Sequence, residues 1–240
     1  DNIRVLEGLI KKPHGILLLT GPTGSGKSTT LYACLNKLNS KDKKIITIED
    51  PVEYEITGIT QIQVAPQVGL DFARGLRSML RHDPDVMMVG EIRDFETAEI
   101  AIRAALTGHL VFSTLHTNDA ASGATRLLDI GVEPYLTASS VEAIIAQRLV
   151  RTLCTRCKAE DDAQDYTLKK RIAADLGLKS INEVKIYRGL GCDNCGGTGY
   201  HGRTALHEIL LMSEGIKNLV LKKASSVEIK ARARQEGMSA

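Results

Sequence analysis

A glycine-rich turn ending in Lys-Ser is the stretch of this chain whose residue types and spacing most clearly suggest chemistry. Residues 16–30 read Ile-Leu-Leu-Leu-Thr-Gly-Pro-Thr-Gly-Ser-Gly-Lys-Ser-Thr-Thr, an apolar strand pattern, then the turn, then a helical pattern. Glycines let the backbone fold tightly around an anion, so that successive N–H groups and the positive end of the following helix face a phosphate. A surface loop rich in Gly and Ser is the alternative, but the flanking strand and helix patterns favour a P-loop.

The P-loop pattern predicts which residues contact a nucleotide. Lys27 is expected to reach the β- and γ-phosphates, and the Ser28 hydroxyl is expected to supply an oxygen to Mg²⁺. The residues predicted to bind the nucleotide in this loop are Gly21, Pro22, Thr23, Gly24, Ser25, Gly26, Lys27, Ser28 and Thr29.

Hydrolysis would need carboxylates besides the phosphate cradle, and acidic residues follow two apolar strand patterns. The run Ile-Ile-Thr-Ile leads into Glu49, Asp50 and Glu53, and the run Val-Met-Met-Val-Gly leads into Glu91. Because ligands of open parallel sheets bind at the carboxyl ends of the strands, both groups are expected to converge on the γ-phosphate. We predict Asp50 as a nucleotide contact, and Glu53 and Glu91 as the catalytic carboxylates, without deciding which of them positions water. Capping of the next helix is the alternative, and it suits Asp94 better than Glu91.

A third polar group follows the apolar strand pattern at residues 110–114. The chain there reads Ser-Thr-Leu-His-Thr, in which Thr114 and His116 could sense the γ-phosphate, although a lone His after a strand is more often structural. Arginines are a further set, because a phosphoryl-transfer site gains from guanidinium groups supplied by the same chain or by a neighbouring subunit. Any one of them could instead form a surface ion pair. The arginines in question are Arg77, Arg81, Arg93 and Arg126.

Two close cysteine pairs indicate a metal site. They read Cys154-Thr-Arg-Cys157 and Cys192-Asp-Asn-Cys195. Four thiolates suit tetrahedral Zn²⁺, and with no position left for water the site is expected to be structural. Disulfide bonds are the rival interpretation, which a cytoplasmic setting disfavours, and iron could occupy the same thiolates during expression. The fifth cysteine, Cys34, is expected to be a buried, small apolar residue.

The elements that must position these residues follow an alternating strand and helix pattern. Such alternation indicates an α/β domain around a largely parallel sheet, and continuous apolar strands fit burial on both faces. Strands are expected at Ile16–Thr20, Ile45–Glu49, Val86–Gly90 and Leu110–Thr114, and helices at Ser28–Asn39, Asp71–Arg81, Thr97–Leu106 and Ala120–Ile130.

The remaining segments are expected to complete three parts. A short antiparallel excursion is predicted at Glu55–Val64, and a helix is predicted at Tyr135–Leu149 from its roughly helical apolar spacing. Further helices are predicted near Glu214–Lys223 and Ser226–Gln235. The expected parts are a P-loop core at 1–150, a tetracysteine subdomain at 151–205, and a C-terminal helical segment at 206–240.

Length and composition restrict the class of protein. With 240 residues and 43% hydrophobic content, the chain can bury one substantial core and a smaller module. The apolar runs are too short to cross a bilayer and the amino terminus lacks a signal-peptide pattern, so we expect a cytoplasmic protein. The 31 basic and 29 acidic residues nearly balance and Trp is absent, which argues against a nucleic-acid binder. A start at Asp1 without Met suggests a piece of a longer protein.

The order of these motifs resembles the bacterial secretion ATPases of type II secretion and type IV pilus assembly. Gly21–Thr30 resembles the Walker A box of that family, Ile48–Tyr54 its Asp box, Asp83–Asp94 its Walker B box and Thr107–Asp119 its His box. The tetracysteine module then follows, so the resemblance covers nearly the whole chain. A single P-loop occurs in many proteins, whereas four boxes in order plus two cysteine pairs are highly specific.

The resemblance implies a fold, an activity and partners. It implies a RecA-like core with a zinc-bound C-terminal subdomain, in which Glu53 and Glu91 position water and the Mg²⁺ shell. It also implies ATP hydrolysis by a cytoplasmic homo-hexameric ring that drives assembly of a pilus or pseudopilus. Platform proteins of the inner membrane are the expected partners and hold the ring at that membrane, and ATP, Mg²⁺ and Zn²⁺ are the expected ligands. A retraction motor is less expected, because that branch usually lacks the tetracysteine module.

Two other functions stay open at the level of sequence. One is a nucleic-acid motor of the RecA type, such as a DNA-uptake machine, although no specific nucleic acid is expected from the near-neutral charge. The other is a docking module in which the charged insert Lys158–Lys185 binds a partner, although such an insert is more often a solvated surface.

Overall fold

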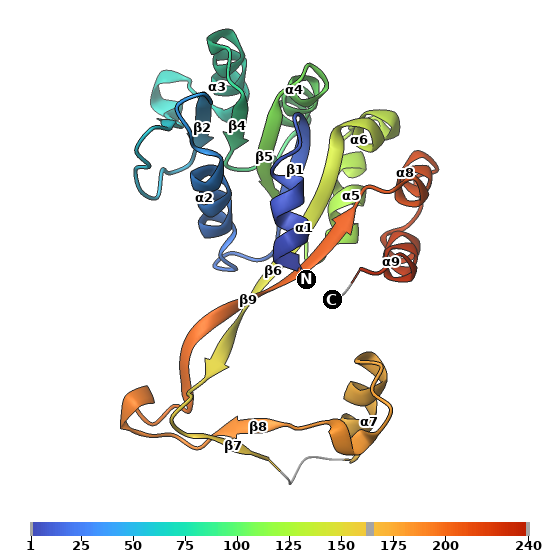
Figure 1. Cartoon of the computed structure of the whole chain (residues 1–240). Coiled ribbons are helices and arrows are strands. Elements are labelled where there is room, and N and C mark those ends of the chain that lie inside the picture. Colours follow the sequence, from blue (N-terminus) through green and yellow to red (C-terminus); the bar gives the residue numbers. More distant parts are fainter. Residues whose placement is uncertain (1, 162–165, 239–240) are drawn as a thin grey trace. The chain divides into compact units, whose positions relative to one another are not determined.

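A largely parallel sheet lies at the centre of the fold (Figure 1). The computed structural model describes residues 2–161 and 166–238, and within them the main sheet has the strand order β3-β2-β4-β5-β1-β6-β9. β1 pairs in parallel with β5 and β6, β2 with β3 and β4, and β4 with β5, which confirms the predicted α/β class. The strands are β1 Gly15–Thr20, β2 Ile45–Glu49, β3 Thr60–Gln63, β4 Val86–Val89, β5 Leu110–Leu115, β6 Val141–Leu153 and β9 Tyr200–Leu211.

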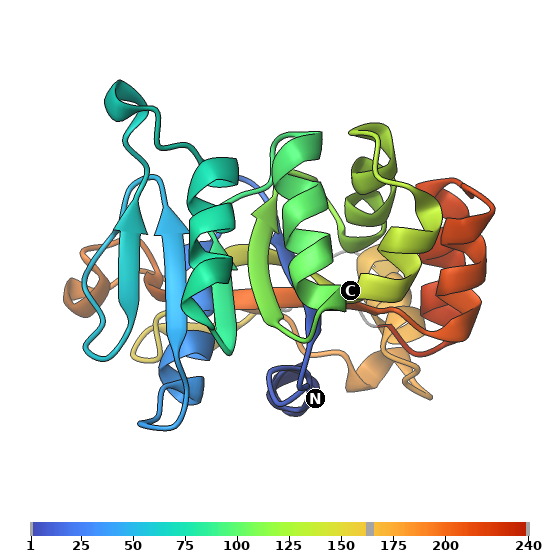
Figure 2. The ribbon, with the colours of Figure 1, turned by 90° about the horizontal axis from the view of Figure 1, so that it is seen from above.

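Helices cover both faces of this sheet (Figure 2). On one face, Leu17 and Leu19 of β1 belong to a core cluster with residues of α1 and α2; on the other, Ile16 and Leu18 belong to a cluster to which the remaining helices of the sheet's unit contribute. Since alternate side chains of a strand point to opposite faces, the continuous apolar run of β1 fills both layers. The helices are α1 Asn2–Leu9, α2 Lys27–Leu38, α3 Phe72–Met79, α4 Phe95–Leu106, α5 Ala120–Asp129, α6 Pro134–Ser140, α8 Glu214–Leu221 and α9 Ser226–Gln235.

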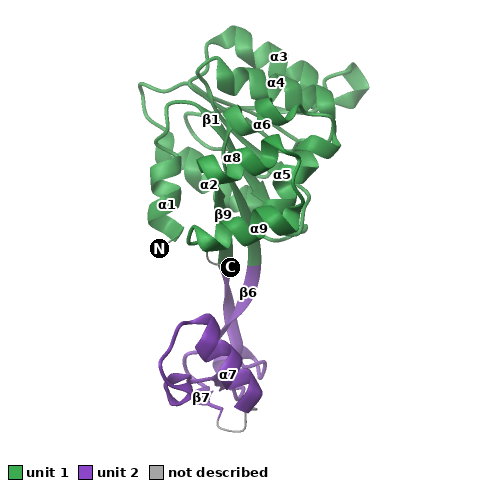
Figure 3. Cartoon of the chain, turned by 90° about the vertical axis from the view of Figure 1, so that its right-hand side faces the viewer, with its two compact units in different colours: residues 1–148, 205–240 green, residues 149–204 purple. Residues whose placement is uncertain are grey.

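The chain divides into two compact units (Figure 3). The first comprises residues 1–148 and 205–240, so the C-terminal helices belong to the same unit as the P-loop. The second comprises residues 149–204 and contains the antiparallel pair β7 Lys158–Glu160 and β8 Tyr187–Gly189 with α7 Tyr166–Asp175. Residues 162–165 of the charged insert lie outside the described residues. No helix in the described ranges has the length and apolar character needed to span a membrane.

The helix predicted at Tyr135–Leu149 is correct only as far as Ser140. Helix α6 ends at Ser140, and the chain continues as β6, which pairs in parallel with β1. Ala143, Ile144 and Ile145 are all buried, because this strand lies inside the sheet and carries a helical layer on each face. A run that is apolar on both faces does not show the period of two that marks a half-buried strand, so its spacing imitated a helix.

The predicted antiparallel excursion at Glu55–Val64 is also wrong. Its strand, β3, pairs in parallel with β2, and Ile62 lies opposite Ile48. The alternation of apolar and polar residues did indicate a strand, and β3 is an edge strand with partly exposed side chains. Alternation carries no information on strand direction; the direction follows from the connection after β2, which returns to the amino end of the sheet before pairing begins.

Replacing either isoleucine of β6 tests whether both of its faces are buried. Ile144→Ala and Ile145→Ala are each expected to lower the free energy of unfolding by about 2–5 kcal/mol, because each side chain fills a different layer. Urea unfolding followed by circular dichroism measures this, with Val68→Ala at an exposed position as the control. A substantial loss for only one of the two isoleucines would contradict the strand assignment.

Candidate functional site

The P-loop connects the carboxyl end of β1 to the start of α2. Gly21, Gly24 and Gly26 have φ values of 141°, 76° and 87°, a left-handed region that residues with a Cβ rarely adopt. At Gly21, a Cβ would also collide with the backbone carbonyl of Gln147. The glycines are therefore required by the backbone path of the turn.

The donors of this loop suit an anion. The Lys27 ammonium donates to the carbonyl oxygens of Gly21 at 2.8 Å and Pro22 at 3.1 Å, so it lies over the loop itself. Burial lowers the pKa of Lys27, and the negative charge of Glu91 acts in the opposite direction. The hydroxyl of Ser25 is buried and has no hydrogen-bond partner among the described residues. A buried donor without a partner is costly, and a phosphate oxygen would satisfy it, so the loop fits a nucleotide phosphate.

The other predicted nucleotide contacts are accessible. Ser28 and Thr29 lie exposed in the first turn of α2, and Pro22, Thr23 and Gly24 are exposed in the loop. The Ser28 hydroxyl is thus available to a hard cation such as Mg²⁺, which prefers oxygen ligands.

Gln147 forms hydrogen bonds that hold the P-loop in place. The sequence analysis did not identify this residue. The residue lies on β6, is only 2% exposed, and uses both ends of its amide. Its Nε2 donates to the carbonyl of Ser25 at 2.8 Å, and its Oε1 accepts from the Thr30 hydroxyl at 2.8 Å. One side chain therefore ties the loop to the first turn of α2. The sequence offered no signal, because this segment was predicted as part of a helix.

Glu91, Arg93 and His116 come together just beyond β4 and β5. The Glu91 side chain is largely buried; Nε2 of His116 lies 2.7 Å from one of its carboxylate oxygens, and the Arg93 guanidinium contacts the other. Two neighbouring hydroxyls fix these strand ends, since Thr114 donates to the Gly90 carbonyl and Ser113 to the Val89 carbonyl, each at 2.7 Å. This places one carboxylate among three cationic or ionisable groups, Lys27 included through its electrostatic interaction.

The acidic residues after β2 behave differently from one another. Asp50 and Glu53 lie exposed in the loop that leaves the strand, whereas Glu49 is buried at its end. The backbone N–H of Glu53 donates to the hydroxyl of Tyr32 on α2 at 3.2 Å. The carboxyl end of β2 lies one strand beyond that of β4, so this loop is at the same edge of the sheet as Glu91.

Among the described residues, Arg93 is the only one of the predicted arginines that contacts Glu91. Arg77 on α3 forms an exposed ion pair with Glu96, and Arg81 lies exposed in a short 3₁₀ turn before the amino end of β4. That end of β4 is opposite the P-loop edge, so Arg81 is not brought to Glu91, and Arg77 is paired with Glu96 instead. Arg126 is exposed on α5. By contrast, Asp94 caps α4 by accepting from the Thr97 N–H at 2.8 Å, as the capping alternative suggested.

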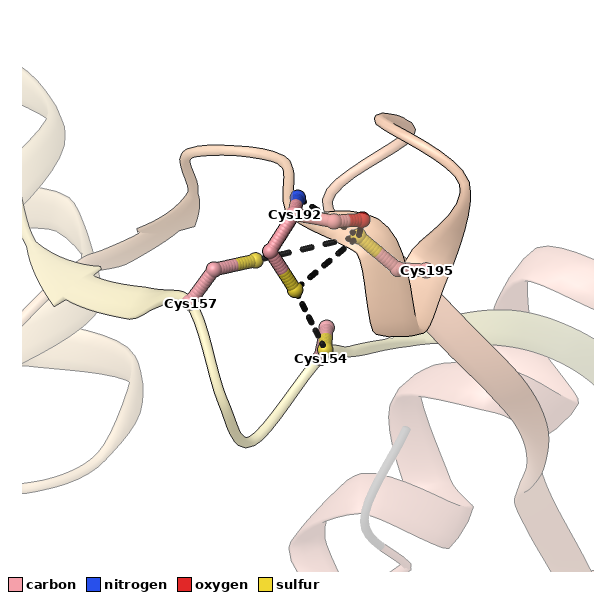
Figure 4. A group of neighbouring side chains, drawn as sticks. All are labelled: Cys154, Cys157, Cys192 and Cys195. Atoms are coloured by element: carbon pink, nitrogen blue, oxygen red, sulfur yellow. Dashed lines mark hydrogen bonds between the residues drawn. The ribbon is translucent and has the colours of Figure 1, made fainter.

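The four paired cysteines form a compact cluster (Figure 4). All four Sγ atoms lie within 4.8 Å of one another, with Cys154 to Cys192 at 3.8 Å and Cys157 to Cys195 at 3.9 Å. Four sulfurs bound tetrahedrally at about 2.3 Å from Zn²⁺ would lie about 3.8 Å apart, so the cluster fits that ion.

Hydrogen bonds within the cluster favour the thiolate form of Cys195. The N–H groups of Cys192 and Gly199 each donate to Sγ of Cys195 at 3.2 Å. Desolvation alone would raise the pKa of Cys195, but these donors outweigh it and lower the pKa to about 6. Cys34, by contrast, is buried in α2, where desolvation raises its pKa to about 11. Burial also raises the pKa of Cys157 to about 11, so it is the clustering of four thiols, and not thiol acidity, that suits the paired cysteines and not Cys34 to a ligand role.

Removing one cysteine of the cluster tests the metal site. The wild-type chain is expected to bind one zinc ion, and the Cys154→Ser variant is expected to lose most of that zinc. Because a structural metal stabilises the unit that it closes, the variant should also exchange backbone amide hydrogens faster across the described residues of 149–204. Metal analysis by emission spectroscopy and hydrogen exchange measure the two effects. Cys34→Ala should retain the metal. Disulfide bonds found by non-reducing mass spectrometry of freshly purified protein would contradict the site.

Replacing Gln147 tests the support of the phosphate loop. Gln147→Leu is expected to weaken binding of ADP with Mg²⁺ by about tenfold, because it leaves the Ser25 carbonyl and the Thr30 hydroxyl without their partner. Isothermal titration measures the affinity, and Gln67→Leu at an exposed position is the matched control. Unchanged affinity in a folded Gln147→Leu variant would show that the loop holds its shape without this side chain.

Comparison with known proteins extends over the whole chain. A family described as Type II/IV secretion system protein matches residues 1–240. Type II secretion system protein E of Aeromonas hydrophila is 52% identical over 219 residues, which are 91% of this chain and 43% of the relative. The type IV pilus assembly ATPase PilB of Thermus thermophilus is 53% identical over 232 residues, which are 96% of this chain and 26% of the relative. The chain thus spans less than half the length of these relatives.

Solved structures agree with this relationship. The pilus retraction motor PilT with bound ADP superimposes with a TM-score of 0.65 at 30% identity, covering 99% of this chain and 62% of PilT. The ATPase DotB of Legionella pneumophila also gives a TM-score of 0.65, at 27% identity, covering 97% of this chain and 54% of DotB. The resemblance drawn from the order of the four boxes is confirmed. Because the family match covers every residue, this chain belongs to the type II/IV secretion system protein family.

Proposed function

We propose that this chain hydrolyses ATP to ADP and phosphate as the motor part of a machine that assembles a pseudopilus or pilus. The observation that carries the proposal is a buried carboxylate that contacts Arg93 and His116 and interacts electrostatically with the P-loop lysine. A phosphate cradle alone only binds; a carboxylate at the same sheet edge adds a group that can orient water. Relatives named as secretion and pilus assembly ATPases support the same activity.

The residues of the site then take the following roles. The P-loop and Lys27 hold the phosphates, with Asp50 as a further nucleotide contact. Mg²⁺ held at Ser28 would neutralise phosphate charge as the bond to the γ-phosphate breaks. Glu91, with Glu53 as the second carboxylate, accepts a proton from the attacking water or orients it. Arg93 and His116 orient the Glu91 carboxylate from either side.

The remaining roles belong to an assembly. Arg77 is exposed and pairs with Glu96, and Arg81 is exposed at the opposite edge of the sheet, so we assign both to the site of a neighbouring subunit. This fits a homo-hexameric ring, in which each interface completes a site. We further propose that the ring lies in the cytoplasm, is held at the inner membrane by platform proteins, and contains one structural zinc per subunit.

Two substitutions test the proposed activity. Lys27→Ala is expected to abolish both ATP binding and phosphate release, since the cradle loses its cation. Glu91→Gln is expected to retain nucleotide while phosphate release falls by about 100-fold or more, because an amide cannot accept the proton. Phosphate release is measured over a range of protein concentrations, and nucleotide binding is measured in parallel. Lys41→Ala and Glu214→Gln, at exposed positions, are the matched controls.

The outcomes separate the competing functions. Specific activity that rises with protein concentration supports sites completed between subunits. Normal turnover in both variants would overturn the proposed activity. Activity that is flat with concentration but stimulated by single-stranded DNA in a salt-sensitive manner would instead favour a nucleic-acid motor.

A further inference from the structure

Glu49 is a buried carboxylate for which the proposed reaction has no use. It ends β2 and is only 4% exposed. A carboxylate removed from water is tolerated when its oxygens accept hydrogen bonds, and those of Glu49 accept three. The hydroxyl of Thr47 donates to Oε1 at 2.6 Å and Nε2 of Gln61 donates to the same atom at 3.1 Å. The hydroxyl of Tyr32 donates to Oε2.

The Tyr32 hydroxyl joins this carboxylate to the loop that carries Glu53. Because an ionised Glu49 can only accept, the single proton of the hydroxyl is committed to it, and the phenolic oxygen is left as an acceptor. That oxygen accepts from the backbone N–H of Glu53 at 3.2 Å. Desolvation, together with the hydrogen bond to Glu49, raises the pKa of Tyr32 to about 12, so the hydroxyl keeps its proton at neutral pH.

Tyr32 is also part of the nucleotide-binding helix. It lies on α2, the helix whose first residue is Lys27, and its ring is fully buried. The rings of Tyr32 and Tyr54 meet edge to face, with centroids 4.6 Å apart. The Tyr32 side chain therefore connects α2, the helix that follows the phosphate loop, with the backbone of Glu53 and the ring of Tyr54.

Gln61 of β3 holds a further part of the same loop. Gln61 donates from Nε2 to the Tyr54 carbonyl at 3.2 Å and accepts at Oε1 from the Ile56 N–H at 2.7 Å. The backbone from Glu53 to Ile56 is thus held by side chains of α2 and β3, while the Glu53 side chain stays exposed. This arrangement leaves a carboxylate facing solvent from a fixed backbone.

We propose that Tyr32 and Glu49 are positioning residues that couple the P-loop helix to the backbone of Glu53. The hydroxyl relay passes any shift of α2 on nucleotide binding to the loop, and it holds the Glu53 carboxylate in place for hydrolysis. The second consequence rests on the proposed ATPase activity and on the assigned role of Glu53. The first consequence, coupling between nucleotide binding and the loop, does not need hydrolysis.

Hydrogen exchange tests the coupling without reference to turnover. In the wild-type chain, saturating ADP with Mg²⁺ is expected to slow amide exchange at residues 52–56 as well as in the P-loop. Tyr32→Phe keeps the ring but removes the hydroxyl, so protection of the P-loop should persist while protection at 52–56 is lost. Tyr135→Phe, at a residue 60% exposed, is the matched control. Equal protection of 52–56 in wild type and Tyr32→Phe, or none in wild type, would overturn the coupling.

Steady-state kinetics test the positioning role. Tyr32→Phe is expected to lower kcat about tenfold while KM and ADP affinity stay within about twofold, because the lost hydrogen bond acts on the orientation of Glu53 and not on phosphate binding. In a Glu53→Gln background the same substitution should have no further effect on kcat. Additive effects of the two substitutions, or a parallel rise in KM, would overturn it.

The two proposals fail separately in these experiments. A wild-type chain without ATPase activity would overturn the proposed function, while hydrogen exchange would still decide the coupling. An active wild-type chain with an unaltered Tyr32→Phe variant would overturn the further inference alone. Glu49→Gln gives a second check, since weakening the acceptor of the Tyr32 proton should reproduce the loss of protection at 52–56.

Discussion

Parallel pairing of β1 with β5 on one side and β6 on the other is the constraint on which the site depends. Because the strands run in the same direction, their carboxyl ends meet at one edge, and the P-loop emerges between the ends of its two neighbours. β5 and the adjacent β4 supply His116 and Glu91, while β6 supplies Gln147. The Gln147 carbonyl of β6 lies so close to Gly21 that no side chain fits between the P-loop and this strand.

The structure keeps two buried carboxylates at this edge in contrasting surroundings. Glu91 contacts the Arg93 guanidinium and Nε2 of His116 and interacts electrostatically with the Lys27 ammonium, and the two cations can respond to an incoming phosphate. Glu49 is surrounded instead by neutral donors from Tyr32, Thr47 and Gln61. A carboxylate satisfied by neutral hydroxyl and amide groups holds a fixed geometry, whereas one near cations shares those cations with an incoming phosphate. The first suits a structural anchor and the second suits a reacting site.

The stability of the tetracysteine unit, residues 149–204, has a different physical basis. Residues 149–204 carry few large buried side chains among those described, so hydrophobic packing alone contributes little to their fold. Pairs of thiols that are 38 positions apart approach one another across tight turns, and backbone N–H groups already point at Cys195. A metal held there would close the long insert at its base and stabilise the unit.

Local patterns in the sequence determined most of the elements and the identity of the loop. β2 and α9 lie where the sequence predicts them, and the glycine spacing and the two cysteine pairs identified their sites, because such signals depend on neighbouring residues alone. Tertiary structure decided that residues 141–153 form a strand and that β3 runs parallel, since burial on both faces and pairing direction depend on distant partners. It also decided the contacts of Gln147, which lie more than a hundred residues away in the chain. The roles open to Tyr32 and Glu49 arise in the same way, because a buried hydrogen bond exists only once the sheet and its helices have packed.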